Sequence, residues 1–291
     1  MLSVNDLKRA PLVSLVQGLR DFGYEEGRNL ELLAPVAGQY GRLGEVAASL
    51  AKRQPEVFVA YGTTAVRAAK AATWTIPIVM VVGTDPVKSG FVRTLAHPEG
   101  NITGIVTNVQ MLAAKRVELL KEILPRIRRI GVLWSAESAT QAGTMKDIEA
   151  AARRVGVDVH TVEVSDPAAL KTAFDSLASS GAEAFIPANS ALFVRERAEV
   201  VRLATTHKLA GVYSEPLTVR QGGLISYGPD ESANFRRAAV FVDRILKGAK
   251  PGEMPVEQPS KYEMVINLKT AKTLGIEIPK AILFRADEVI Q

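Results

Sequence analysis

The sequence predicts an α/β protein of two lobes, each with a parallel sheet between layers of helices. Short apolar strands alternate with amphipathic helical segments along most of the 291 residues. This alternation completes one cycle by about residue 106 and then begins again in the same order. With 47% hydrophobic and 23% charged residues, the chain can bury two cores of ordinary size.

The first segment indicates a strand end followed by a helix. Met1 to Val4 resembles the last part of a strand, so we expect further residues to precede this chain. A strand is expected over Asn29 to Val36, and a helix over Leu43 to Ala51. The helix after Val4 keeps its apolar residues at helical spacing, namely Leu12, Leu15, Val16, Leu19 and Phe22.

The stretch from Val57 to Tyr61 predicts a strand buried on both faces. Gly62 permits a sharp exit, and Thr63 or Thr64 can cap the following helix, whose free N–H groups face the carboxyl end of the strand. Ligands of open α/β sheets bind at that edge. The alternative is that Gly-Thr-Thr is only a good strand-to-helix turn. The same arrangement recurs along the chain, which favours a ligand-binding site.

The next strands repeat this polar exit. Ile76 to Val82 is an apolar strand that leaves through three polar or small residues, Gly83, Thr84 and Asp85. Ile102 to Val106 then supplies a short strand after a turn-forming segment. The first cycle therefore predicts up to five strands, which suffice for one α/β layer structure.

The second cycle begins with a helix over Leu112 to Leu124. Five further strands are expected, over Ile130 to Trp134, Val157 to Val164, Ala184 to Ala188, Gly211 to Tyr213 and Gly223 to Tyr227. One helix is expected between Ser190 and His207. Polar residues again follow the strands, and those expected at the sheet edge are Ser135, Asn189, Ser190, Ser214 and Glu215.

Composition and motifs argue against the other common function classes. The sequence lacks the Gly-x-Ser-x-Gly, Walker A and Gly-x-Gly-x-x-Gly signatures, so we predict no enzymatic activity and no cofactor. His97, His160 and His207 are far apart in sequence and fit surface or capping roles, so no metal site is predicted. The 36 basic and 31 acidic residues give a net charge of +5 without basic-aromatic clusters, which does not favour nucleic-acid binding.

Membrane and redox signals are also absent from the sequence. No apolar run approaches the roughly 18 to 20 residues of a membrane span, so direct membrane insertion is not expected. The absence of cysteine excludes disulfides and a lipid-modified N-terminal cysteine. Residues 1 to 30 lack the pattern of a secretory signal, so the chain is either cytoplasmic or an exported protein without its export signal.

Several motifs together resemble a known family. They are Gln17 to Tyr24 with Glu26 to Leu30, Ile76 to Val79 with Asp85 to Gly90, Gly100 to Gly104, Gly222 to Gly228, Pro255 to Pro259 and Val265 to Lys272. The chain resembles a substrate-binding protein of an ABC-type importer, in the type I periplasmic-binding group that includes tryptophan- and tyrosine-binding members. It departs from that pattern at its N-terminus and at Ser135 to Ser138, where an Asn-Pro-type loop is usual.

The resemblance implies two Rossmann-like lobes joined by a multi-segment hinge, with the ligand in the cleft between them. We expect lobe 1 to comprise residues 1–107 and 229–256, and lobe 2 to comprise residues 108–228 and 257–291. It also implies a periplasmic location, a membrane permease of an ABC transporter as partner, and a monomeric protein. A cytoplasmic small-molecule sensor on the same fold is the alternative, and an enzyme is a more distant one.

The expected ligand is a small carboxylate-bearing molecule, an amino acid that could be aromatic. Its carboxylate is expected at the helix start after Gly62, and Asp85 or Glu215 is expected to hold an ammonium group, with Glu215 preferred. Each acidic residue could instead be a turn or loop residue, and the tyrosines near these strand ends could stack on the ligand or be core residues. The predicted ligand-binding set is Ser3, Tyr61, Gly62, Thr63, Thr64, Gly83, Thr84, Asp85, Ser135, Asn189, Ser190, Ser214, Glu215 and Tyr227.

Overall fold

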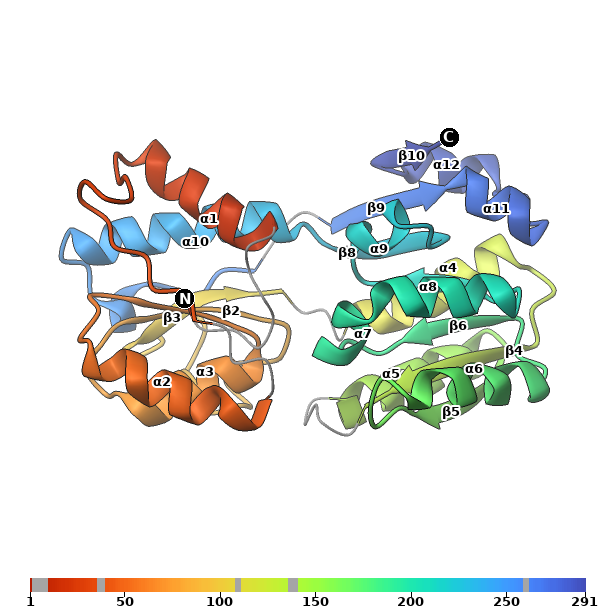
Figure 1. Ribbon diagram of the computed structural model, residues 1–291, viewed down its shortest axis with the longest axis horizontal. Helices are drawn as coiled ribbons and strands as arrows, with labels where there is room; N and C mark the ends of the chain where they lie inside the picture. The colour runs from red at the N-terminus through yellow and green to blue at the C-terminus, as the bar shows by residue number, and fades with distance from the viewer. Residues whose placement is uncertain (2–9, 36–39, 108–110, 136–140, 259–261) are drawn as a thin grey trace. The chain divides into compact units, whose positions relative to one another are not determined.

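The computed structural model describes residues 1, 10–35, 40–107, 111–135, 141–258 and 262–291. The chain divides into two compact units (Figure 1). Unit 1 is Met1–Asn108 with Asp230–Lys261, and unit 2 is Val109–Pro229 with Tyr262–Gln291. These boundaries lie close to the expected lobe boundaries, with the differences that residues 108 and 257–261 fall in unit 1 and residue 229 falls in unit 2. The chain therefore passes between the units three times.

Unit 1 contains a parallel sheet of three described strands, in the order β1-β2-β3. The strands are β1 (Phe58–Tyr61), β2 (Ile78–Val82) and β3 (Ile102–Val106). Every residue of β2 and β3 is buried, which matches the continuous apolar sequence of a parallel strand covered on both faces. Of the expected first strand, only Met1 is among the described residues.

The strand expected over Asn29 to Val36 is wrong for the described residues 29–35, which contain only an isolated bridge between Glu26 and Leu30. A tight turn over residues 27–29 begins this segment, and the Asn29 side chain closes it by accepting a hydrogen bond from the Glu25 N–H at 2.7 Å. Residues 31–35 have no regular secondary structure, and Pro35 has no N–H to donate to a sheet. The expectation of up to five strands in this cycle therefore exceeds the three described.

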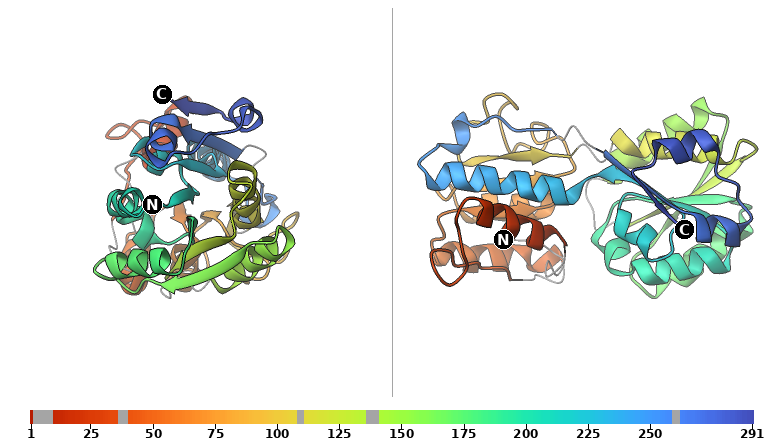
Figure 2. Two further views of the ribbon diagram at one scale, coloured as in Figure 1. Left: turned by 90° about the vertical axis from the view of Figure 1, so that its right-hand side faces the viewer. Right: turned by 90° about the horizontal axis from the view of Figure 1, so that it is seen from above.

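The helices of unit 1 cover both faces of its sheet. They are α1 (Ala10–Asp21), α2 (Leu43–Lys52), α3 (Thr63–Ala72) and α10 (Glu231–Leu246), with 3-10 turns at Tyr40–Arg42 and Pro251–Glu253. Helices α1 and α10 lie side by side (Figure 2). A Cβ on Gly18 would lie 2.8 Å from the Ala239 Cβ, so this glycine permits the close approach of the two helices. As expected, the segment after residue 230 returns to unit 1 as a helix.

Unit 2 contains a seven-stranded sheet in the order β10-β9-β8-β7-β6-β4-β5, parallel except for the antiparallel pair β8 and β9. The strands are β4 (Arg129–Trp134), β5 (Asp158–Glu163), β6 (Ala184–Pro187), β7 (Ala210–Tyr213), β8 (Ile225–Pro229), β9 (Tyr262–Asn267) and β10 (Glu288–Ile290). The helices are α4 (Met111–Ile123), α5 (Gln141–Arg154), α6 (Ala169–Ser179), α7 (Ala191–Arg195), α8 (Arg197–Thr206), α9 (Pro216–Arg220), α11 (Leu268–Leu274) and α12 (Lys280–Arg285). The helix expected up to His207 is thus two helices, which meet at Glu196.

The sheet of unit 2 separates two hydrophobic cores. Alternate residues of one strand enter opposite cores, as with Val132 and Leu133 of β4 or Val212 and Tyr213 of β7. Residues of α4 and α5 pack in the first core, and residues of α6 and α8 pack in the second. Burial on both sides explains why these strands are apolar at consecutive positions.

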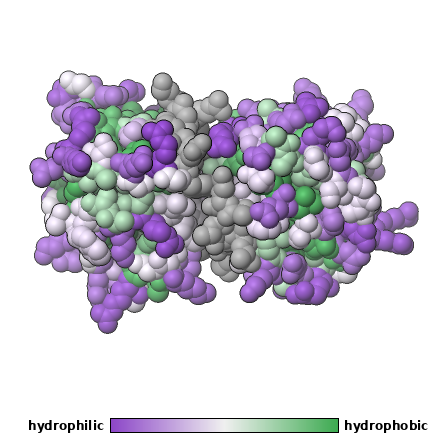
Figure 3. Space-filling model, turned by 60° about the horizontal axis from the view of Figure 1, so that its bottom comes forward, coloured by the Kyte–Doolittle hydropathy of each residue, from purple (hydrophilic) through white to green (hydrophobic). Residues whose placement is uncertain are grey.

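The surface of both units is mixed. Hydrophilic side chains project over the face shown in Figure 3, and apolar residues lie between them. The large apolar side chains exposed among the described residues are few and scattered along the chain, namely Val13, Phe22, Trp74, Val87, Leu246 and Phe284. Within the described part of the chain, no helix combines the length and hydropathy needed to cross a bilayer.

Candidate ligand-binding site

In unit 1, the ends of β1 and β2 bring predicted residues together. Gly62 adopts φ 88° and is the N-cap of α3, so Thr63 is the first helical residue and neither threonine is the cap. A residue with a Cβ would be strained at this backbone angle. The Thr63 and Thr84 hydroxyls lie 2.8 Å apart and share a hydrogen bond. Two predicted hydroxyls from neighbouring strand ends therefore meet beside the start of α3.

Tyr61, at the end of β1, contacts the start of α10. Its hydroxyl donates a hydrogen bond to the Glu231 carboxylate, and its ring packs edge-on against Phe235 at 5.2 Å. Asp230 caps this helix by accepting a hydrogen bond from the Ala233 N–H at 2.9 Å. Glu231 is not among the residues that the sequence predicts for the site. The signal available was its place in the first turn of a helix that returns to the first lobe.

Asp85 forms the contacts of a turn residue. Its carboxylate accepts hydrogen bonds from the Val87 N–H at 2.9 Å and the Lys88 N–H at 3.2 Å. The Lys88 ammonium lies 3.8 Å from it. These bonds hold the loop after Gly83. Ser3 lies outside the described residues, and Thr64 lies in the first turn of α3.

In unit 2, four predicted residues line one pocket. Asn189 and Ser190 follow β6, and Ser214 and Glu215 follow β7. The Ser190 hydroxyl also caps α7 by accepting from the Phe193 N–H at 3.3 Å. This pocket is partly open to solvent, and its volume of about 20 Å³ leaves room for about one water molecule. The remaining lining residues are Pro187, Ala188, Phe193, Val194, Val200, Tyr213 and Thr218.

Glu215 lies near two buried arginines. The Arg197 Nη2 atom is 3.5 Å from a Glu215 carboxylate oxygen, and both side chains are largely buried. Arg116 of α4 is fully buried and donates from Nε to the Tyr227 carbonyl at 2.9 Å. Burial lowers the pKa of Arg116 to about 10, while the charge of Glu215 acts in the opposite direction. The side chain preferred as an ammonium partner is thus accompanied by cations of the protein itself.

The other two predicted residues of unit 2, Ser135 and Tyr227, are not among the residues that line this pocket. The Tyr227 ring packs against Tyr262 at 6.1 Å. Ser135 is buried at the end of β4. Tyr213 lines the pocket, packs edge-on against Phe185 at 5.8 Å, and has a pKa that burial raises. We did not include Tyr213 in the predicted ligand-binding set, although it directly precedes Ser214 in the sequence.

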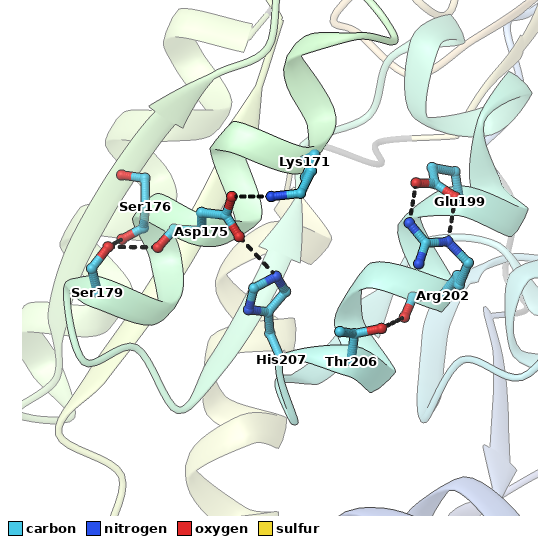
Figure 4. Close-up of polar contacts among 8 residues, drawn as sticks. All are labelled: Lys171, Asp175, Ser176, Ser179, Glu199, Arg202, Thr206 and His207. Atoms are coloured by element: carbon cyan, nitrogen blue, oxygen red, sulfur yellow. Dashed lines mark hydrogen bonds and ion pairs between the residues drawn. The ribbon is translucent and has the colours of Figure 1, made fainter.

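The histidines have structural contacts. His207 pairs through Nε2 with Asp175 at 3.2 Å, and Lys171 binds the same carboxylate at 2.7 Å (Figure 4). The Lys171 hydrogen bond chiefly lowers the pKa of Asp175, which is exposed. His160 is hydrogen bonded through Nε2 to the Ser176 hydroxyl at 3.2 Å. The described residues contain no group of three or more potential metal-ligating side chains.

Comparisons with known proteins identify the family of this chain. The family model described as ABC transporter substrate binding protein matches residues 9–290. The chain belongs to this family. A tyrosine-binding protein of Clostridioides difficile is 26% identical over 263 residues, which are 90% of this chain and 75% of that protein.

Two solved structures resemble this substrate-binding protein over nearly its whole length. A conserved domain protein from Vibrio cholerae is 30% identical, with a TM-score of 0.89 over 96% of this chain and 94% of the other. An ABC domain from Streptococcus pneumoniae in complex with L-Trp is 26% identical, with a TM-score of 0.89 over 100% and 97% of the two chains. These similarities confirm the expected family and its type I fold with two α/β lobes.

Within this substrate-binding protein, the predicted residues form two groups, one in each unit. The group in unit 1 lies at the carboxyl ends of β1 and β2 and has hydroxyls beside a helix start. The group in unit 2 lies at the carboxyl ends of β6 and β7 and includes amide, hydroxyl and carboxylate side chains. Taken by itself, the group in unit 1 offers hydrogen-bond donors that suit an anionic group, and the group in unit 2 offers a carboxylate acceptor that suits a cationic group.

Proposed function

We propose that this protein is the solute-binding component of an ABC import system that captures an amino acid in the cleft between its lobes. The observation that carries the proposal is that Asn189, Ser190, Ser214 and Glu215 line one pocket at the carboxyl end of the second sheet. Ligands of open α/β sheets bind at this edge. Relatives that bind tyrosine or are solved with L-Trp support an aromatic amino acid as the ligand.

The two groups of residues have complementary roles in this proposal. The start of α3, with Gly62 and Thr63, receives the ligand carboxylate through N–H and hydroxyl donors. Glu215 accepts hydrogen bonds from the ligand ammonium, and Glu231 is a second acidic residue, placed in unit 1. Tyr213 and Phe193 give the pocket an aromatic wall. Closure of the lobes about the three crossover segments would remove the ligand from water.

The same proposal includes a location and a partner. The protein acts outside the cytoplasm, in the periplasm, and delivers its ligand to the membrane permease of an ABC transporter. It acts as a monomer, without nucleic acid and without enzymatic activity. The match of the family model over residues 9–290 favours this role over a cytoplasmic sensor on the same fold.

A thermal-shift screen tests the ligand class. L-tryptophan, L-tyrosine and L-leucine are compared with the deaminated acids 3-indolepropionate and 3-(4-hydroxyphenyl)propionate. We expect the aromatic amino acids to raise the unfolding temperature more than their deaminated analogues, because only they present an ammonium group to Glu215. Equal stabilisation by the deaminated acids would show that the ligand is a simple organic acid.

A substitution then tests the role of Glu215. Glu215→Gln should weaken binding of the amino acid by about 10- to 100-fold, the equivalent of one charge-assisted hydrogen bond of about 1.5–3 kcal/mol. Glu199→Gln is the matched control, because Glu199 pairs with Arg202 on the exposed side of α8 in the same unit. Unchanged amino-acid affinity in Glu215→Gln would remove Glu215 from the binding site.

A further inference from the structure

Unit 2 contains two buried arginines and one half-buried carboxylate beside the proposed pocket. Arg116 is 2% exposed and Arg197 is 8% exposed, and Glu215 is the acidic side chain near both. The two arginines come from opposite faces of the sheet, since α4 residues pack in one core and α8 residues pack in the other. Glu215 follows β7 at the edge between these faces.

Neither arginine completes its hydrogen bonds in the part of the chain that the structure describes. Arg116 Nη2 and Arg197 Nε are buried there and have no hydrogen-bond partner. Leaving buried charged donors unpaired costs more than leaving neutral ones unpaired. Burying both guanidinium groups next to the pocket therefore lowers the folding stability. This cost is offset if the two groups contribute to ligand binding.

The arginines do not line the pocket. Glu215 belongs to the pocket wall, whereas Arg116 and Arg197 do not. A ligand in this pocket would therefore meet the carboxylate and not the two guanidinium groups. A carboxylate in a closed pocket tends to take up a proton because burial disfavours its charged form. A nearby cation opposes that tendency.

We propose that Arg116 and Arg197 are positioning residues that keep Glu215 ionised and fixed at the pocket wall, so that it can accept hydrogen bonds from the ammonium group of an amino acid. This inference rests on the proposed function for the identity of the ligand group. It concerns the charge state of the carboxylate, which can also be measured without a ligand. Among the described residues, two further titratable groups lie close to these side chains: Tyr213 lines the pocket, and Tyr227 lies near Arg116.

The first test measures unfolding temperature without ligand between pH 5 and pH 8. Arg116→Met should lower the unfolding temperature more at pH 8 than at pH 5. At pH 8 the Glu215 carboxylate is charged and lacks the Arg116 guanidinium, whereas protonation of Glu215 at low pH removes that charge. In the Glu215→Gln background the same substitution should lose this pH dependence. An equal loss at both pH values, or the same pH dependence in the Glu215→Gln background, would overturn the inference.

Other variants keep this test decisive. Arg116→Lys retains the charge and should restore the pH profile of the wild type. Arg197→Met should behave as Arg116→Met does, and its result alone decides if Arg116→Met does not fold. Arg202→Met is the control, because Arg202 is an exposed α8 residue with a bidentate pair to Glu199 at 2.6 and 2.7 Å. It should leave the pH profile unchanged.

The second test measures the dissociation constant of L-tryptophan over the same pH range. Arg197→Met should bind about tenfold more weakly at pH 5.5 than at pH 8, whereas the wild type should vary little over this range. A flat profile for the variant would contradict the role of Arg197. If the wild type binds no amino acid, the proposed function fails, while the ligand-free unfolding series still decides whether the arginines act on Glu215.

Discussion

Gly228 of β8 is in close contact with the loop that contributes Ser214 and Glu215 to the pocket. A Cβ on Gly228 would lie 1.9 Å from the Ser214 carbonyl oxygen and 3.0 Å from the carbonyl carbon. Ordinary contacts of a Cβ begin at 3.4 Å, so the Gly228→Ala methyl group requires a displacement of about 1.5 Å. The obstacle is backbone, which cannot rotate away as the end of a side chain can.

We expect Gly228→Ala to reduce both stability and binding. Overpacking of this kind costs about 1–3 kcal/mol in unfolding free energy. The displaced peptide carries Glu215, so a hydrogen bond from the ligand to that carboxylate would be stretched or lost. The affinity for L-tryptophan should then decrease by about tenfold or more, since such a bond is worth about 1.5–3 kcal/mol.

Chemical denaturation and calorimetric titration of the purified variants measure the two effects. Gly143→Ala is the matched control, because Gly143 lies within α5 of the same unit and a Cβ there meets nothing within 4 Å. That substitution should stabilise the protein by about 0.5–1 kcal/mol through helix propensity and leave binding unchanged. A Gly228→Ala protein with wild-type stability and affinity would refute the close approach of β8 to the Ser214 peptide.

Three further substitutions test the remaining contacts. Thr63→Val removes the 2.8 Å hydrogen bond to Thr84 and should weaken amino-acid binding about tenfold by titration, and unchanged binding would exclude this hydroxyl pair from the carboxylate site. Tyr61→Phe removes the hydrogen bond to Glu231 and should lower the free energy of unfolding by about 1 kcal/mol, which denaturant titration can measure, and no change would mean that this bond does not contribute. Hydrogen bonds from Ser165 and Ala169 lower the pKa of Asp166 below its ordinary value of 3.8, so its contribution to stability is present above that pH and is lost as pH falls below it. Asp166→Asn should therefore lower the unfolding temperature at pH 7 and have a diminishing effect towards pH 3, and a difference that stays constant over this range would contradict the assignment.

Local sequence rules predicted the strand ends that carry the candidate site. Residues 57 to 64 contain an apolar strand, a glycine and a helix start, and each feature acts within a few residues of the chain. The same rule selected Asn189, Ser190, Ser214 and Glu215, which the structure places around one pocket. Carboxyl ends of parallel strands share one edge of a sheet, and β6 and β7 are neighbours in this sheet, so residues distant in sequence meet there.

The rule failed where a local signal competed with a turn. Three leucines between residues 30 and 33 favour a strand, but the Asn29 side chain closes a turn just before them and Pro35 follows. Glu231 was not selected for another reason. Its contact with Tyr61 joins residues 170 positions apart, and it depends on the return of α10 to the first sheet. Periodicity identifies that helix, but it does not specify which strand end the helix start will meet.

Arg116 left a signal that the sequence analysis did not use. Leu112, Arg116 and Leu120 recur every fourth residue along α4, so the arginine occupies a position of the buried face. A charged residue at a core position of an amphipathic helix is costly unless a partner offsets it, and the helix itself offers none at that position. The partners must therefore come from elsewhere in the fold, and for a helix that begins at the carboxyl edge of a parallel sheet they are strand-end residues. The structure supplies the Tyr227 carbonyl and the charge of Glu215. A buried arginine in the first turns of such a helix thus predicts an acidic partner. That partner should lie at a strand end on the carboxyl edge of the sheet.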